Sequence, residues 1–327
     1  MCLWLLLHYE LRGSGSIHRI IGASGGPSHA NRSKVFELKA LQRNREPTRA
    51  PLTLTWTEIC SISWAGFQTQ GGPIPKPIDP RWPRGYVPKS QYGRIWYSRD
   101  RIPVLDLLGR AIARKILSFA SPLHGYWLEI GCGPGGLLPS VCAGAEVAVG
   151  LEINKEMVED AAALTRSMCG ASYVIRGSAY SMPFGDSSFD GVIAMETMEH
   201  LESRKALKEI TRLLKPGGRL VLSVPVETGS ALVVRQLVRW LLHSRNPSFS
   251  PMLYSSRDFA RMIFGDDRAL HLEKRIASSF DHLYFSWRVL LEEMQATLSI
   301  KRIGWSPLPF PGPWTLSVVV AAAADSA

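Results

Sequence analysis

The chain has 327 residues, of which 46% are hydrophobic, and its mean hydropathy is zero. These values are ordinary for a soluble protein, and the length is enough for one α/β domain with additions. The net charge of +10 is unevenly divided, with +11 in residues 1–120 and −3 in residues 121–225. Because the basic excess lies away from the motifs described below, we predict no specific nucleic-acid partner.

Residues 1–88 show no sustained hydrophobic period. Gly- and Ser-rich stretches at Gly13–Ser16 and Gly22–Ser28 and a Pro-rich stretch over Pro73–Pro88 interrupt them. The apolar run Leu3–Leu7 is too short to cross a membrane. We therefore expect residues 1–88 to be a disordered or loosely packed extension, and the main domain to occupy residues 89–327.

The rest of the chain alternates between helical and strand-like patterns. An amphipathic stretch over Val104–Ser118 predicts a helix after the aromatic residues Trp96 and Tyr97. Strands alternating with helices indicate a parallel sheet with helices on both faces. Five strands are expected at Trp127–Ile130, Val147–Leu151, Tyr173–Ile175, Val192–Met195 and Leu220–Val224, three helices at Gly136–Cys142, Lys155–Met168 and Leu201–Leu214, and a final hairpin at Ser299–Ile303 and Thr315–Ala322.

A glycine-rich turn directly follows the first of these strands, in the sequence Glu129-Ile-Gly-Cys-Gly-Pro-Gly135. Glycines at the carboxyl edge of a parallel sheet let a ligand approach the backbone and the N-terminus of the next helix. The spacing also satisfies the dinucleotide fingerprint if Gly136 is included, with Glu152 where a ribose-binding acid is expected. Glu129 favours a cationic ammonium group over a pyrophosphate as the neighbouring ligand, because a second negative charge repels phosphate.

Further motifs follow in order at Gly150–Asn154, Met182–Asp190, Val192–Leu201 and Leu214–Pro225. Together with the glycine turn, they resemble the class I S-adenosylmethionine-dependent methyltransferases of the type 11 group. The resemblance implies a doubly wound α/β fold whose seven-stranded sheet has the order 3-2-1-4-5-7-6, with the last strand antiparallel. The cofactor implied is S-adenosylmethionine, and the cofactor-binding residues implied are Glu129, Gly131, Cys132, Gly133, Gly135, Glu152, Ile153, Ser178, Ala179 and Met195.

Two of these positions have particular roles in the resemblance. Glu152 matches the acid that takes both ribose hydroxyls. Ser178 stands where the family commonly has an Asp that contacts the adenine amino group, so the hydrogen bond there would come from a neutral hydroxyl.

The function predicted is methyl transfer to a small or lipid-linked acceptor. His200 follows the fourth strand and is the candidate general base, with a structural role in the loop as its alternative. Two other functions stay open: a nicotinamide-dependent oxidoreductase, and a non-catalytic cofactor-binding partner subunit.

The acceptor is expected to bind the segment 226–296, between the fifth and sixth strands. Its predicted helix 231–242 carries Arg235 and Arg239 one turn apart. We expect these arginines to hold an anionic group or to contact a membrane surface peripherally, with a packed lid as the alternative.

The five cysteines are scattered and form no Cys-x-x-Cys pair, and no histidine stands at a metal-binding spacing from them. We therefore predict no metal site, reduced thiols and a cytoplasmic location. Cys132 is expected to contribute its backbone to the glycine turn rather than to act as a nucleophile.

Overall fold

The computed structural model describes Lys89 and residues 103–169, 172–243, 251–275, 282–309 and 311–325. The chain divides into two compact units, residues 1–34 and 35–327, and every described residue belongs to the second. The expectations for residues 1–88 and for Trp96 and Tyr97 fall outside the described residues.

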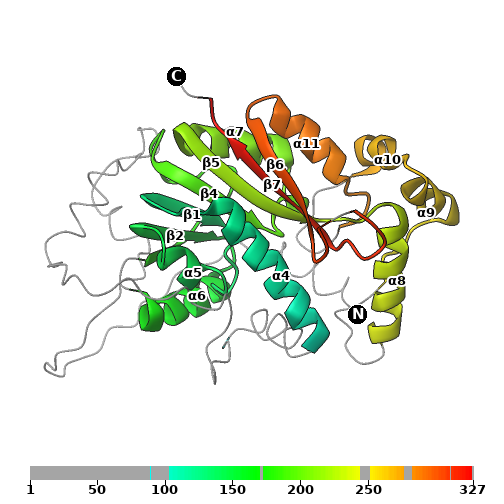
Figure 1. Ribbon diagram of the computed structural model, residues 1–327, viewed down its shortest axis with the longest axis horizontal. Helices are drawn as coiled ribbons and strands as arrows, with labels where there is room; N and C mark the ends of the chain where they lie inside the picture. The colour runs from blue at the N-terminus through cyan, green and yellow to red at the C-terminus, as the bar shows by residue number, and fades with distance from the viewer. Residues whose placement is uncertain are drawn as a thin grey trace, which may run out of the picture. The chain divides into compact units, whose positions relative to one another are not determined.

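One seven-stranded sheet forms the centre of this unit (Figure 1). Its order is β3-β2-β1-β4-β5-β7-β6, as predicted. The first five strands run parallel, and β7 is antiparallel to both β5 and β6. The strands are β1 (Tyr126–Ile130), β2 (Val147–Glu152), β3 (Ser172–Arg176), β4 (Phe189–Met195), β5 (Leu214–Pro225), β6 (Ser299–Ser306) and β7 (Ser317–Ala323).

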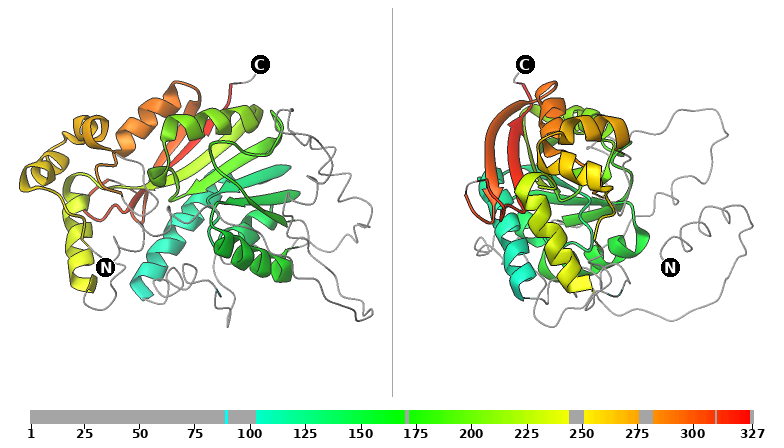
Figure 2. Two further views of the ribbon diagram at one scale, coloured as in Figure 1. Left: turned by 180° about the vertical axis from the view of Figure 1, so that it is seen from behind. Right: turned by 90° about the vertical axis from the view of Figure 1, so that its right-hand side faces the viewer.

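Helices cover both faces of the sheet, which confirms the doubly wound fold (Figures 1 and 2). Along β1, the buried Trp127 packs with the helices of one face and the buried Leu128 with those of the other, as the two-residue strand period requires. The first face carries α4 (Pro103–Ala120), α5 (Leu138–Cys142) and α6 (Lys155–Met168), and the second carries α7 (Ser203–Leu213) and α11 (Trp287–Gln295).

The start of β5 is where the predicted boundaries differ most from the structure. The sequence predicted a helix that ends at Leu214 and a strand that begins at Leu220, with Lys215-Pro-Gly-Gly between them. The structure instead begins β5 at Leu214, which pairs with Phe189 ahead of a register shift in the ladder. Gly217 has a φ of +73°, so glycine lets the strand pass through this irregular stretch. The helix predicted at Lys155–Met168 matches α6, whose N-terminus is capped by the Asn154 side chain.

The segment between β5 and β6 forms α8 (Gly229–His243), α9 (Ser256–Ile263), α10 (Asp267–Lys274) and α11. Leu232, Met262 and Leu270 are buried together and make a small hydrophobic cluster of their own beside the sheet. Figure 2 shows α8, α9 and α10 grouped beyond the end of β5. Among the helices of the described ranges, none has both the length and the apolar character needed to cross a membrane.

The prediction of reduced thiols is wrong for one pair of cysteines. Cys142, the last residue of α5, is joined by a disulfide to Cys169, which follows α6. The two residues are 27 positions apart in sequence, and only the packing of α5 against α6 brings them together. The cytoplasmic location rested partly on reduced thiols, and it stays a prediction.

Candidate functional site

The glycine turn lies at the carboxyl end of β1, between β2 and β4. Gly131, Gly133 and Gly135 all have positive φ, so each uses a conformation that costs other residues energy. A Cβ on Gly131 would collide with the Thr197 side chain in the loop after β4. A Cβ on Gly135 would touch the backbone of α6. A Cβ on Gly133 would meet nothing within 4 Å. Of the three, Gly133 therefore borders open space that a ligand can enter.

Two buried carboxyl groups stand beside this turn. The backbone N–H of Gly133 donates to Oε2 of Glu152 at 3.0 Å, and the N–H groups of Ile153 and Asn154 donate to its Oε1. Glu129 is 2% exposed, and its Oε2 has no hydrogen-bond partner. Burial, aided by the charge of Glu152, raises the pKa of Glu129 to about 8. Glu129 is thus a buried acid whose charged form needs a cation.

Cys132 lies inside the turn and is buried. Burial and then the charges of Glu129 and Glu152 raise the pKa of its thiol well above the ordinary value. A thiol kept in its neutral form is a poor nucleophile, in keeping with the backbone role predicted for this residue.

Three further residues predicted to bind the cofactor, Ile153, Ser178 and Ala179, follow β2 and β3. The side chain of Ile153 is 65% exposed although it is large and apolar, and Arg176 donates to its carbonyl oxygen. Ser178 and Ala179 follow β3, whose end is tied to β2 by a hydrogen bond from Gly177 N–H to the Glu152 carbonyl oxygen. Ser178 Oγ accepts a hydrogen bond from Tyr180 N–H and still has its own proton to donate.

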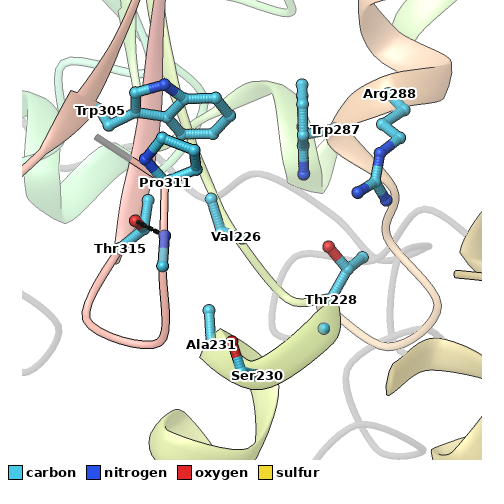
Figure 3. A pocket seen from close by; sticks show the side chains of 11 residues that line it. Val226, Thr228, Ser230, Ala231, Trp287, Arg288, Trp305, Pro311 and Thr315 are labelled. Atoms are coloured by element: carbon cyan, nitrogen blue, oxygen red, sulfur yellow. Dashed lines mark hydrogen bonds between the residues drawn. The ribbon is translucent and has the colours of Figure 1, made fainter. Parts of the chain in front are cut away.

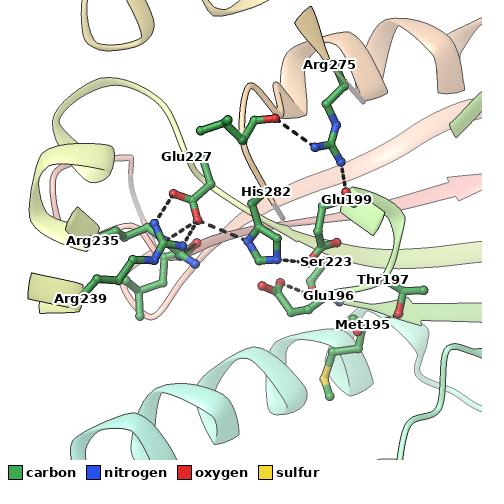
Figure 4. A network of polar contacts seen from close by, with 12 residues as sticks. Met195, Glu196, Thr197, Glu199, Ser223, Glu227, Arg235, Arg239, Arg275 and His282 are labelled. Carbon is green, nitrogen blue, oxygen red and sulfur yellow. Dashed lines mark hydrogen bonds and ion pairs between the residues drawn. The ribbon is translucent and has the colours of Figure 1, made fainter. Parts of the chain in front are cut away.

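The end of β4 carries Met195, Glu196 and Thr197, shown in Figure 4. The Thr197 hydroxyl lies near the carbonyl oxygens of Ile130 and Met195, at 3.2 and 3.0 Å, and so links the ends of β1 and β4. Glu196 has a φ of +49°, a strained value for a residue other than glycine, and such strain often occurs at functional sites. Ser223 Oγ donates a hydrogen bond to the Glu196 carboxylate. Burial raises the pKa of Glu196 despite the nearby charge of Arg235.

The two arginines of α8 do not form the anion-binding face that the sequence suggested. Arg239 makes two hydrogen bonds to the fully buried Glu227, and Arg235 Nε lies 3.0 Å from the same carboxylate. Burial alone would raise the pKa of Glu227, but the charges of Arg235 and Arg239 outweigh it and lower this pKa. Both arginines are thus committed to an internal ion pair, because a buried carboxylate must be paired.

Three side chains from distant parts of the chain meet beside this ion pair. Glu199 and His200 belong to η2 (Met198–His200), the short 3-10 helix after β4, and His282 precedes α11. The rings of His200 and His282 are 4.9 Å apart, and His282 Nε2 lies 4.0 Å from Glu199 Oε1. His282 Nδ1 lies 3.4 Å from Glu227 Oε1 (Figure 4). We refer to Glu199, His200 and His282 as the His–Glu cluster.

Glu199 is the least satisfied member of this cluster. Its side chain is fully buried, and neither carboxylate oxygen has a hydrogen-bond partner. Arg275 approaches it but donates to the carbonyl oxygens of Glu199 and Leu283 instead. Burial and then the charge of Glu196 raise the pKa of Glu199 well above its ordinary value.

A cavity of about 130 Å³ opens at the start of α8 (Figure 3). Val226 and Thr228, on either side of Glu227 in sequence, both line it. Trp287 and Trp305 pack edge to face beside it with ring centres 5.2 Å apart. The cavity is too small for a nucleoside cofactor, but its aromatic wall suits an apolar part of an acceptor.

Sequence reasoning missed His282 and Glu227, although it brought His200 to the correct edge of the sheet. His282 could not be linked to His200 from the sequence, because the two histidines are 82 positions apart. Glu227 lies two residues after the end of β5, at the carboxyl edge of the parallel strands. Carboxyl ends of neighbouring parallel strands gather functional groups, so that position alone made it a candidate.

The glycine turn and the two acids fit S-adenosylmethionine. The open space at Gly133 admits a ligand against the backbone, and Glu152 ends β2 with lone pairs suited to ribose hydroxyls. The unpartnered Oε2 of Glu129 suits the ammonium group of the methionine part. The site residues that the sequence predicted therefore lie along the ends of β1, β2, β3 and β4, while their individual roles stay predictions.

Comparison with known proteins agrees with this fit. The model of a family described as a methyltransferase domain matches residues 128–222. The O-methyltransferase cnsE of Penicillium expansum is 33% identical over 133 residues, 39% of this chain and 48% of that protein. The O-methyltransferase resE of Aspergillus sclerotiorum is 36% identical over 133 residues, 39% of this chain and 50% of that protein. The chain thus spans about half the length of these curated relatives.

A plant enzyme and a solved structure extend the comparison. The 24-methylenesterol C-methyltransferase 2 of Oryza sativa subsp. japonica is 38% identical over 107 residues, 31% of this chain and 29% of that protein. The crystal structure of the PH0226 protein from Pyrococcus horikoshii OT3 covers 72% of this chain and 99% of its own, with a TM-score of 0.51 and 19% identity. At that identity the structural likeness concerns the fold alone.

Proposed function

We propose that this chain, which carries in residues 128–222 a methyltransferase domain of the class I S-adenosylmethionine-dependent family, methylates a hydroxyl oxygen of a small or lipid-linked acceptor. The observation that carries the proposal is the placement of two sites along one edge of the sheet. The glycine turn and Glu152 end β1 and β2, and the His–Glu cluster follows β4 beside the end of β5. Cofactor and acceptor would therefore meet where β1 and β4 end side by side.

The chain's own residues would bind and orient the reactants. Glu152 would accept hydrogen bonds from the ribose hydroxyls, and Glu129 would accept one from the ammonium group. The backbone at Gly133 would contact the methionine part. When bound, the cofactor supplies a methyl group already activated on a sulfonium. The His–Glu cluster would take the proton of the acceptor hydroxyl, and its position beside the end of β4 would orient the acceptor oxygen toward that methyl group.

Oxygen is favoured as the attacking atom because imidazoles near the end of β4 can take up a hydroxyl proton, and because the two fungal relatives are named as O-methyltransferases. A carbon acceptor is the second candidate. It is favoured by the plant C-methyltransferase relative and by the carboxyl groups of Glu196 and Glu199, which can stabilise a cationic acceptor. The product separates the two, since a methoxy group and a C-methyl group have distinct NMR shifts.

We also propose that α8 contacts lipid, whether the acceptor's own chain or the bilayer that holds it. Arg235 and Arg239 pair with the buried Glu227, so the support for lipid contact comes from the exposed apolar side chains of α8. Trp240 is 67% exposed, and four further apolar residues of the same helix are exposed, namely Val233, Leu237, Val238 and Leu241. Replacing Trp240 and Leu241 with Ser should lower co-sedimentation with phospholipid vesicles without changing affinity for S-adenosylmethionine. Equal co-sedimentation of both proteins would contradict the lipid contact.

The main experiment is incubation with methyl-labelled S-adenosylmethionine and a metabolite and lipid extract. We expect a labelled product with wild-type protein and none with Glu152→Ala, whose fold is checked by its thermal transition. Calorimetry is run in parallel with S-adenosylmethionine and with NAD. Binding of S-adenosylmethionine without any labelled product would favour a non-catalytic partner subunit, and binding of NAD alone would favour an oxidoreductase.

A further inference from the structure

The His–Glu cluster has the composition of a metal-binding site. Each of its three members offers one ligand atom, and these atoms lie within 4.8 Å of one another. Two imidazoles and one carboxylate are a donor set typical of divalent transition metals such as Zn²⁺, Mn²⁺ and Fe²⁺. Ligands at about 2.1 Å from a tetrahedral metal are about 3.4 Å apart, so the side chains would have to move inward by about 1 Å.

A second, independent observation concerns Glu199. A fully buried carboxylate normally accepts several hydrogen bonds, yet neither oxygen of Glu199 has a hydrogen-bond partner, and His282 Nε2 lies 4.0 Å from Oε1. The Arg275 guanidinium donates to the backbone carbonyl oxygens of Glu199 and Leu283. A bound cation would supply the close partner that this carboxylate lacks.

The support behind His282 points the same way. Glu227 is held in place by Arg235 and Arg239, and its Oε1 lies 3.4 Å from His282 Nδ1. In this arrangement a proton on Nδ1 is directed at Glu227, and the lone pair of Nε2 is directed toward Glu199. A carboxylate behind a ligating histidine orients the ring in this way at many metal sites.

We propose that Glu199, His200 and His282 bind one divalent transition-metal ion, with Glu227 as the positioning residue behind His282. With three protein ligands, the ion keeps a coordination position for an oxygen atom. In the context of the proposed function that atom is the acceptor hydroxyl, and with the ion bound its proton would pass to solvent water, because the lone pairs of the cluster are then occupied by the metal. No metal site was predicted from the sequence, because the two histidine ligands are 82 positions apart and have no recognisable metal-binding spacing.

The test is metal binding by the full chain without tag, stripped with chelator and then dialysed against Zn²⁺ or Mn²⁺. We expect one ion per chain by elemental mass spectrometry, and titration calorimetry with the same metal gives its affinity. Glu199→Gln keeps the size of the side chain and should weaken that affinity at least tenfold, as should His282→Asn. His124→Ala, which removes an exposed imidazole at the opposite edge of the sheet, is the matched control and should bind as wild type does.

Glu227→Gln tests the positioning role and should weaken metal binding tenfold to a hundredfold, the range seen for outer-shell partners. Thermal transitions show whether each variant is folded. If one variant does not fold, the metal affinities of the remaining variants test the proposal. Substoichiometric metal in the wild type, or equal affinity in Glu199→Gln and His124→Ala, would overturn the proposal. Since binding is measured without cofactor or acceptor, that result would leave methyl transfer by a metal-free cluster untouched.

Discussion

Glu129 makes the stability of this protein depend on pH in a direction that is unusual for a carboxylic acid. Its pKa is raised from 4.5 to about 8 by burial and by Glu152. Between these values the folded protein binds one proton more than the unfolded chain, so raising the pH favours unfolding. The associated loss of stability is about 1.4 kcal/mol per pH unit.

We predict that Glu129→Gln removes this dependence. In denaturant titrations of the ligand-free protein, the variant should gain stability relative to wild type as the pH rises from 4.5 to 8. Below pH 4.5 the two should differ by a constant amount, since both side chains are then neutral. The buried Glu196 and Glu199 are common to both proteins and cancel in the comparison. Parallel curves over the whole range would show that Glu129 is already ionised in the folded state.

Gly133 provides a test of where the cofactor binds. Its φ of +52° makes alanine unfavourable there by about 1–2 kcal/mol, and the new methyl group would enter open space. Gly217 is a matched control, because it has a φ of +73° and open space around it but lies near the opposite edge of the sheet.

We predict that Gly133→Ala and Gly217→Ala lose similar stability, whereas only Gly133→Ala weakens binding of S-adenosylmethionine, by more than tenfold. Calorimetric titration and thermal melting measure the two effects separately. If both variants bind as wild type does, the cofactor does not contact the turn at this position.

At the scale of elements, the disulfide between α5 and α6 should contribute measurably to stability. Cys142 and Cys169 close a loop across 27 positions, for which loop-closure entropy gives about 3 to 4 kcal/mol. We predict that the double variant Cys142→Ala/Cys169→Ala is less stable than the oxidised wild type by about this amount in denaturant titrations. With a strong reductant present, the two proteins should unfold at nearly the same denaturant concentration. A wild type unaffected by reductant would mean that this disulfide does not form in solution.

The elements were predictable to different degrees, for physical reasons. The helix α6 was predicted to the residue because Asn154 caps it and its apolar period is regular. The parallel strands were found from short apolar runs, since both faces of the sheet are covered. The start of β5 was missed because Lys215-Pro-Gly-Gly has the composition of a turn, while the pairing of Leu214 with Phe189 is a tertiary effect.

The candidate site divides in the same way. The glycine turn, Glu152 and His200 each lie within one short motif, so they could be predicted from the sequence. The ion pair of Arg235 and Arg239 with Glu227 could not be read from helical spacing, because spacing says which residues share a face and not what that face contacts. The Cys142–Cys169 pair and the His200–His282 contact likewise depend on packing between distant segments.

At the scale of the whole molecule, the sheet and both of its hydrophobic clusters are built from residues after position 103. Lys89 is the earliest described residue with a contact to this unit, through a hydrogen bond of 2.8 Å from its backbone N–H to Asp160. The proposed cofactor and acceptor residues all lie beyond it. Residues 1–88 lie outside the described residues, and they carry +6 of the net charge of +10.

We predict that a chain truncated to residues 89–327 keeps its fold and binds S-adenosylmethionine with an affinity within about threefold of the full chain, because every described contact of the core and the candidate site is retained. Its net charge falls from +10 to +4, so it should elute earlier from a cation exchanger. Thermal unfolding followed by circular dichroism and calorimetric titration measure fold and affinity. The boundary would be wrong if the cooperative transition disappeared. If the fold were kept but affinity fell strongly, residues 1–88 would take part in the cofactor site itself.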